Sequence, residues 1–199
     1  MNIDTAIDTE ARAILDFWFG PPGSTEHGKS RAEWFRKSPA FDAEIAMRFG
    51  PTIERALRGE LRAWDAQPES ALARILVLDQ FTRNTFRETS RAFAGDALAL
   101  AAARSMVAAG HDGALLPVQR GFVYLPFEHA EGLALQDESV RLFTQLHAVA
   151  PETDRLLDYA HRHRAVIAQF GRFPHRNAWL GRASTAEEVA FLAEPGSGF

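Results

Sequence analysis

The chain has 199 residues, of which 46% are hydrophobic and 24% charged, and its formal net charge is −4. This composition is typical of a globular protein with a sizeable core, and the negative charge makes nucleic acid an unexpected partner. The absence of cysteine excludes disulfides, thiolate metal sites and cysteine nucleophiles. The acidic N-terminal stretch is unlike a secretory signal, and the longest near-apolar run contains Arg104. We therefore expect no membrane span and a cytoplasmic protein.

Helical patterns follow one another from the N-terminus. TEARAILDFWF (9–19) has the apolar spacing of a helix and stops at the strong breaker GPPG. RAEWFRK (31–37) is predicted as a short helix. A Ser-Pro pair at 38–39 is typical of a helix cap and first turn. Pro51 predicts the start of another helix, which should break at Gly59.

The middle of the chain continues the helical pattern. Pro68 opens the apolar run PESALARILVLDQF, and the stretch 96–110 has an Asp cap and a Gly stop. Pro117 starts PVQRGFVYL. Leu125-Pro126 then disfavours an unbroken helix, because proline lacks an amide and restricts the residue before it.

The last third also predicts helices. Asp137 is the expected cap of ESVRLFTQLHAVA, and Pro151 starts a helix that ends at Gly171. A capping box from Ser184 to Glu187 should precede the short helix VAFLA.

The chain therefore predicts an all-α protein of about ten short helices joined by short loops. Short loops make neighbouring helices antiparallel, which favours stacked helical hairpins as in α-solenoids. We expect a single domain over 1–199, with a short flexible tail from about residue 195.

The stretch LDQFTRNTFR (78–87) places polar residues at the end of a helix that is apolar nearly all round. Such a helix is buried, so Asp79 and Arg83, four residues apart, are expected to pair inside the protein. Gln80, Asn84 and Arg87 flank them. A buried charge without partners costs several kcal/mol, so this cluster needs further groups from elsewhere in the chain.

QRGFVYLPFEHAE (119–131) is one source of partners. A break before Pro126 would start a new turn that holds Glu128, His129 and Glu131, with Arg120 earlier in the stretch. The two glutamates and the histidine suit a divalent metal or a general acid–base pair. The alternative, which we favour, is that the carboxylates neutralise arginines. No metal-ligand motif is present, and we predict neither a metal nor a cofactor.

The loop RFPHRN (172–177) is the other source. Arg172, His175, Arg176 and Asn177 surround Phe-Pro after a helix stop, and they form the best anion-binding candidate in the chain. The alternative is a solvated basic loop. His163, on the helix before it, is expected to be a core histidine with a hydrogen bond.

LDQFTRNTFR, LPFEHAE and RFPHRN, together with ILDFWFG near the start and STAEEVAFL…GSGF at the end, resemble an uncharacterised bacterial family. This family is known as domain of unknown function 924, and the resemblance covers nearly the whole chain. It implies a helical fold like that of tetratricopeptide repeats. It implies no activity and no catalytic residues.

Three classes of function remain open. The first is a binding module in which the arginines and His175 hold a carboxylate or phosphate from a small molecule or peptide terminus. The second is an enzyme that uses Glu128 or His129 as acid–base and an arginine to stabilise negative charge. The third is a protein-interaction scaffold with a purely structural polar core. The C-terminal Phe199 could fold back over the basic pocket. Oligomeric state is left open.

Overall fold

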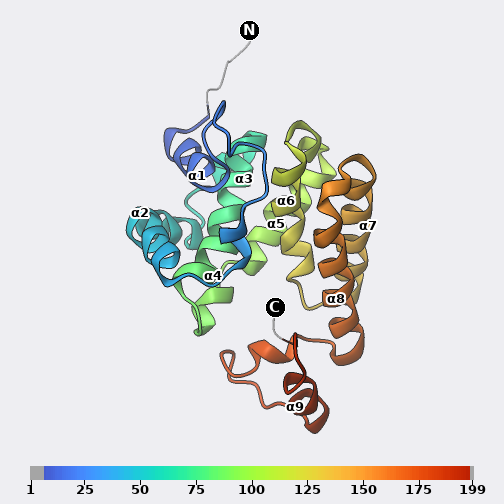
Figure 1. The fold of residues 1–199 in the computed structure, drawn as a ribbon. Helices are drawn as coiled ribbons and strands as arrows, with labels where there is room; N and C mark the ends of the chain where they lie inside the picture. Colours follow the sequence, from blue (N-terminus) through green and yellow to red (C-terminus); the bar gives the residue numbers. More distant parts are fainter. Residues whose placement is uncertain (1–6, 198–199) are drawn as a thin grey trace.

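The computed structural model describes residues 7–197, and all regular secondary structure in that range is helical (Figure 1). The α-helices, in chain order, are α1 (Thr9–Phe19), α2 (Pro39–Leu57), α3 (Pro68–Leu76), α4 (Thr82–Thr85), α5 (Asp96–Ala108), α6 (Pro117–Glu128), α7 (Leu133–Val149), α8 (Asp154–Phe170) and α9 (Ala186–Leu192). Short 3-10 turns lie between many of them. Because α3 and α4 form one continuous rod, residues 7–197 hold eight separate helices rather than about ten.

Two of the predicted helix boundaries are wrong. Pro51 lies inside α2 on its exposed face, and the carbonyl of Met47 that loses its donor belongs to a residue that is 77% exposed. Water can therefore replace the missing hydrogen bond. Leu125-Pro126 lies inside α6, close enough to its end that few backbone bonds are affected. The predicted short helix at 31–37 is a 3-10 turn, Ala32–Phe35.

Helix caps were partly predictable. The Ser38 hydroxyl accepts from the third residue of α2 at 3.4 Å, as expected. Asp137, however, lies inside α7, which begins after Gly132. The capping box of α9 is formed by Thr185 and Glu188, one residue later than the predicted pair. Caps are set by backbone geometry, so the nearest Ser, Thr or Asp in the sequence is only an approximate guide.

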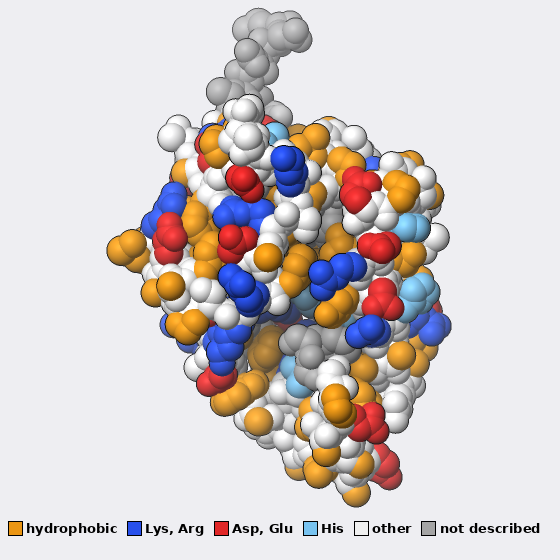
Figure 2. Space-filling model, in the orientation of Figure 1, with side chains coloured by type: hydrophobic (Ala, Val, Ile, Leu, Met, Phe, Trp, Pro, Cys, Tyr) orange, Lys and Arg blue, Asp and Glu red, His pale blue; other side chains and the backbone are white. Residues whose placement is uncertain are grey.

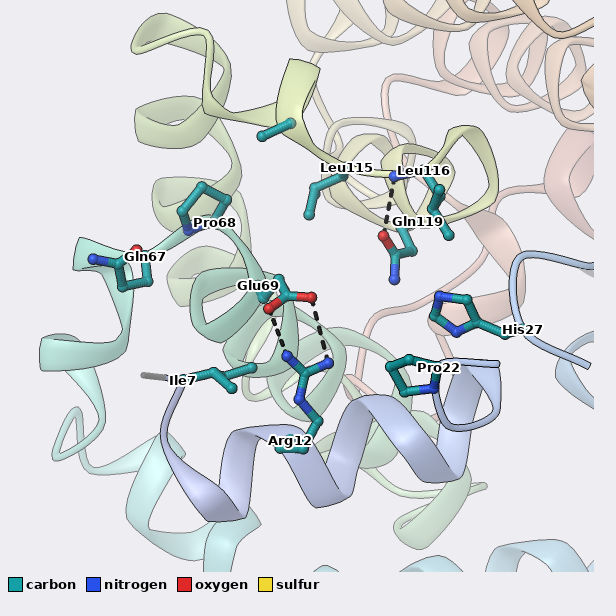
Figure 3. A pocket seen from close by; sticks show the side chains of 11 residues that line it. Ile7, Arg12, Pro22, His27, Gln67, Pro68, Glu69, Leu115, Leu116 and Gln119 are labelled. Carbon is teal, nitrogen blue, oxygen red and sulfur yellow. Dashed lines mark hydrogen bonds and ion pairs between the residues drawn. The ribbon is translucent and has the colours of Figure 1, made fainter. Parts of the chain in front are cut away.

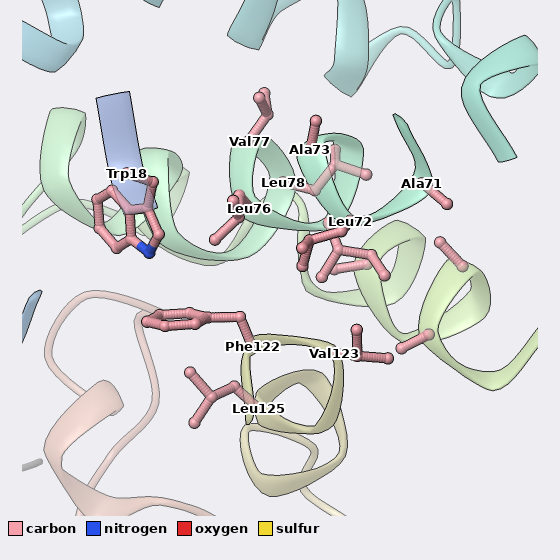
Figure 4. Packing of buried hydrophobic residues seen from close by; sticks show 14 of the residues in the cluster. Trp18, Ala71, Leu72, Ala73, Leu76, Val77, Leu78, Phe122, Val123 and Leu125 are labelled. Atoms are coloured by element: carbon pink, nitrogen blue, oxygen red, sulfur yellow. The ribbon is translucent and has the colours of Figure 1, made fainter. Parts of the chain in front are cut away.

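The core is centred on α3, which is buried on all sides as its composition predicts. Leu72 and Leu76 are fully buried and face α1 and α6 (Figure 4). The ring centroids of Trp18 on α1 and Phe122 on α6 lie 5.7 Å apart, and those of Trp34 and Phe122 lie 4.9 Å apart. Each such buried side chain contributes about 1.5–3 kcal/mol of hydrophobic stabilisation. Because Leu72 and Leu76 belong to the same buried cluster, this packing holds α3 against α1 and α6.

Helices α6, α7 and α8 pack side by side, and the segment with α9 lies below their lower ends (Figure 1). The C-terminal ends of the α3–α4 rod and of α6 point toward this segment. Polar residues far apart in the sequence therefore meet at one place. Among the described residues, no helix is both long and apolar enough to cross a membrane.

Candidate functional site

A π-helical segment, Val77–Phe81, joins α3 to α4 and carries Asp79. Its backbone stays in the right-handed helical region, so the rod continues without a break. π-helical segments are rare, are often confined to single turns, and occur frequently at functional sites. The Asp79 side chain is only 1% exposed although it carries an ionisable carboxyl group. The sequence gives no indication of this change in helix type.

Asp79 has a full set of partners. Its Oδ1 lies 2.7 Å from Nδ1 of His129 and 3.0 Å from Nη1 of Arg83, and its Oδ2 accepts from Gln80 at 2.5 Å. Burial opposes its ionisation, but Arg83 and His129 outweigh burial and hold its pKa well below the usual value. Asp79 is therefore an ionised carboxylate, and the predicted Asp79–Arg83 pair is present.

Arg83 and Arg176 meet at the carboxylate of Asp96. Arg83 donates to it from Nη1 and Nη2 at 2.8 and 3.1 Å, and Arg176 donates from Nη1 at 3.3 Å. Asp96 is the first residue of α5 rather than its cap, which is Gly95. The first turn of a helix favours a carboxylate, so Asp96 is suited to hold both cations.

Arg176 is a buried cation with few partners. Its guanidinium lies between the rings of Phe93 and Phe173, 4.9 and 4.5 Å from their centroids, and the residue is 5% exposed. Its Nε is buried and has no hydrogen-bond partner among the residues that the structure describes. Burial and the repulsion of Arg83 lower its pKa to about 10, although Asp96 opposes the change. The ionised form is therefore less favourable here than in water.

Glu128 is the last residue of α6 and is 2% exposed. Its Oε1 lies 3.1 Å from Nδ1 of His163, whereas its Oε2 has no hydrogen-bond partner within residues 7–197. Burial and the neighbouring charge of Asp79 raise the pKa of Glu128 well above its ordinary value. Both effects favour the protonated form of Glu128, and a nearby cation would oppose them.

The histidines around this point are neutral. Burial, and then Arg83, lowers the pKa of His129, while Asp79 opposes the change. Burial, and then His129, lowers the pKa of His163 to about 3. Burial, Arg176 and Arg83 lower the pKa of His175 to about 4. As expected, His163 is a core histidine, and its Nδ1 lies 2.9 Å from the carbonyl oxygen of Tyr159.

One group of side chains could hold a metal ion. Glu128, His129 and His163 each offer one ligand atom, and these atoms lie within 4.8 Å of one another. The sequence pointed to Glu128 and His129 for such a role but paired them with Glu131. His163 takes that place because α8 packs against α6.

The sequence-predicted site residues divide into two groups. Six of them lie close together around Asp79 and Glu128. We call these six residues the polar cluster: Asp79, Arg83, Glu128, His129, His175 and Arg176. Sequence reasoning missed Asp96 as the shared carboxylate. The sequence predicts Asp96 only as a cap, although its position at a helix start also favours a carboxylate that pairs with cations.

The other predicted residues have different partners. Arg172 donates to Glu188 at 2.6 and 2.8 Å, and Asn177 donates to the same carboxylate. Glu131 accepts from Arg182 at 2.6 and 2.9 Å. The pair of Glu131 with Arg182 joins the chain after α8 to the end of α6, whereas the pairs with Glu188 hold that last part of the chain together.

Arg87 and Arg120 lie in separate networks. Arg87 donates to Asp42 at 2.5 and 3.0 Å. Arg120 donates to the hydroxyl of Tyr124, which itself donates to Asp112 at 2.5 Å. The partners of both arginines lie outside the polar cluster, so each has a structural role of its own.

The molecular surface is hollowed on the face above the C-terminal segment (Figure 2). Lys and Arg side chains border the hollow on both sides. A different pocket, of about 470 Å³, lies near the starts of α3 and α6 and includes Arg12, Glu69 and Gln119 (Figure 3). Arg12 and Glu69 pair at 2.7 Å, so this pocket offers a ligand less unsatisfied charge than the polar cluster does.

Fold and site together define an all-helical protein with a buried carboxylate–guanidinium–histidine cluster. A family model described as "Bacterial protein of unknown function (DUF924)" matches residues 14–196, and the chain belongs to this family. It is similar to a solved structure titled "Structure of Protein of Unknown Function ATU0120 from Agrobacterium tumefaciens". The two are 39% identical, the match covers 92% of this chain and 96% of that one, and the TM-score is 0.79. No curated protein matches the chain.

Proposed function

We propose that the protein binds a small anion, a carboxylate or a phosphate, at the polar cluster. The observation that carries this proposal is the state of Arg176. It is 5% exposed, its Nε has no partner in the described part of the chain, and it shares Asp96 with Arg83. A buried guanidinium is normally surrounded by acceptors, because removing a charge from water is costly. An anionic ligand would supply the missing acceptors.

A purely structural role explains Arg176 less well. The guanidinium lies over the rings of Phe93 and Phe173, and a hydrophobic side chain would contact these rings without the cost of desolvating a cation. Groups retained at a cost in stability are characteristic of functional sites. This favours the binding module over the scaffold.

The ligand class follows from the donors. Guanidinium groups recognise planar carboxylates and phosphates through paired N–H donors. A small metabolite or the carboxylate of a peptide terminus would fit this description, in the cytoplasm and without nucleic acid. A tetratricopeptide-like stacking of the helical hairpins, which is part of this proposal, would place the polar cluster on a concave face.

An acid–base enzyme is the second candidate, and the Asp79–His129 contact favours it. A carboxylate at 2.7 Å from Nδ1 orients the ring and leaves Nε2 to accept a proton. The His129 side chain is 14% exposed, so a substrate could reach it. Glu128 is the less suitable base, because burial and the charge of Asp79 raise its pKa and favour the protonated form. This function would be identified if the wild type converts a bound carboxylate or phosphate compound to product and His129→Gln still binds that compound but no longer converts it.

Anion binding is tested on protein treated with a chelator. Thermal unfolding is followed with increasing inorganic phosphate and, separately, succinate. A specific site should raise the midpoint, since a ligand at 100 times its Kd adds about 2.7 kcal/mol, and added salt should weaken the effect.

Arg176→Met should lose the response. Arg164→Met is the matched control, because Arg164 pairs with Asp137 at the surface. Equal responses in the two variants, or no response in the wild type to either anion, would refute the proposal.

A further inference from the structure

We infer that Glu128, His129 and His163 form a binding site for a divalent transition-metal ion. Their ligand atoms lie within 4.8 Å of one another, and they come from the end of α6 and from α8. Two imidazoles and one carboxylate form the ligand sets of catalytic zinc sites and of non-haem iron sites. The set has no thiolate and too few oxygens for calcium or magnesium.

The three side chains need only small movements to close on an ion. Ligand atoms about 2.1 Å from a metal lie roughly 3.0–3.5 Å from each other, so the widest pair must approach by about 1.5 Å. Rotation of the Glu128 carboxyl group and of the imidazole rings can supply this movement. Helix positions do not have to change.

Both histidines are oriented by groups behind them. Asp79 lies 2.7 Å from Nδ1 of His129, and the Tyr159 carbonyl lies 2.9 Å from Nδ1 of His163. Metal-binding histidines usually donate their other N–H to a carboxylate or a backbone carbonyl, which fixes the tautomer and the ring direction. In the tautomer with the proton on Nδ1, the lone pair of each neutral ring is on Nε2. Nδ1 of His163 also lies 3.1 Å from Oε1 of Glu128.

Glu128 supplies the anionic ligand. Its Oε2 is buried without a hydrogen-bond partner among the described residues, and buried carboxyl oxygens normally have one. Gln136 holds the Glu128 backbone by donating to its carbonyl at 2.6 Å, so the side chain starts from a fixed point. A cation would stabilise the ionised carboxylate at a position where burial alone disfavours it.

The metal also suits the charge of the polar cluster. When Glu128 is ionised, it joins Asp79 and Asp96 as a third carboxylate against Arg83 and Arg176, which leaves a net negative charge. A divalent ion changes this to a net positive charge. Three protein ligands leave coordination positions open for a water or an anion. The inference does not depend on anion binding, because its ligands are different residues from Arg176.

The experiment uses chelator-treated full-length protein in chloride buffer without phosphate or carboxylates. Zn²⁺ is titrated by calorimetry, and Co²⁺ by its visible absorption, which reports coordination. We expect about one ion per chain. Glu128→Gln should bind at least about 100-fold more weakly, and Asp79→Asn about 10–100-fold more weakly.

His161→Gln is the matched control, because His161 is exposed on α8 near His163 and should leave binding unchanged. Thermal unfolding shows which variants are folded. If Glu128→Gln does not fold, His129→Gln takes its place, since His129 is partly exposed. Equal binding by the wild type and the ligand variant would mean that surface histidines take the metal, and would overturn the inference.

Absence of Zn²⁺, Co²⁺, Fe²⁺ and Mn²⁺ binding by the folded wild type would overturn it as well. The anion titration is made with chelator present and the metal titration without anions. Failure of one proposal is therefore distinguishable from failure of the other.

Discussion

Arg83 and Arg176 donate to one carboxylate, that of Asp96, although Arg83 lies near the middle of the chain and Arg176 in its last quarter. The two cations are not equivalent. Arg83 also pairs with Asp79 at 3.0 Å and donates to its backbone carbonyl at 2.7 Å. Within residues 7–197 the Arg176 side chain donates to Asp96, and its guanidinium lies over the rings of Phe93 and Phe173. Arg83 therefore has the environment of a structural cation, and Arg176 that of a cation available to a ligand.

Replacing Arg83 by Met should destabilise the protein by about 3–5 kcal/mol, because it leaves the buried Asp79 without its main cation. The free energy of unfolding in urea measures this. Arg162→Met is the control, since Arg162 forms an exposed pair with Asp158 and should change stability by less than about 0.5 kcal/mol. A loss below about 1 kcal/mol for Arg83→Met would show that His129 and Gln80 suffice to stabilise Asp79.

Replacing Arg176 by Met should leave stability unchanged or increase it. The pKa of Arg176 is lowered to about 10, so the folded state disfavours its charged form at every pH below that value. Removing the charge removes this cost, and Met can pack between Phe93 and Phe173. Urea unfolding of anion-free protein provides the measurement. A loss as large as that of Arg83→Met would make Arg176 a structural residue and weaken the case for an anion site.

Much of this arrangement could be predicted from local sequence. The apolar run before Asp79 indicates a buried helix, and the spacing of Asp79 and Arg83 indicates their pairing. A buried ion pair needs further partners, so the convergence of the 128–129 and 175–176 segments was also foreseeable. Each of these predictions depends only on the spacing of residues within one helix or on the free-energy cost of burying a charge.

The remaining features depend on packing between helices. The approach of His163 to Glu128 requires the relative rotation of α6 and α8, which no local pattern specifies. The π-helical segment has no residue signature, because an i→i+5 bond can form with almost any side chains. The sequence predicts Asp96 as a cap because Asp is common at helix N-caps. Its role as the acceptor for both Arg83 and Arg176 depends on tertiary packing, which the local sequence does not specify.

Acid should weaken the ion pair between Arg172, just after α8, and Glu188 in α9. Hydrogen bonds from Arg172 lower the pKa of Glu188 from 4.5 to about 2. A carboxyl group with a depressed pKa in the folded state stabilises the protein above its unfolded pKa, and this stabilisation is lost as pH falls through the folded value. Thermal midpoints should therefore fall between about pH 4.5 and pH 2.

Glu188→Gln tests the source of this pH dependence. The variant should have a lower midpoint at neutral pH and a flatter dependence over the same acid range, because its side chain cannot be protonated there. Glu194→Gln is the control, since Glu194 is exposed nearby. An unchanged acid profile in Glu188→Gln would assign the acid sensitivity to other carboxyl groups.

Gly95 is required where the polar cluster meets the π-helical segment. A Cβ added at Gly95 would lie 2.0 Å from the carbonyl oxygen of Leu78, which is much shorter than a non-bonded contact between these atoms allows. Gly95→Ala must therefore push the start of α5, and with it Asp96, away from the α3–α4 rod. We expect a loss of about 2–4 kcal/mol in urea unfolding, of the size that overpacking of a core produces.

The same variant should weaken the response to phosphate, because Asp96 positions both guanidiniums. Gly50→Ala is the matched control. Gly50 is in α2, has no atom within 4 Å of an added Cβ, and should gain about 0.5–1 kcal/mol from the helix propensity of Ala. If Gly95→Ala lost stability but kept the full phosphate response, the anion site would not depend on the position of Asp96. If it lost neither, the close contact between α5 and the π-helical segment would itself be wrong.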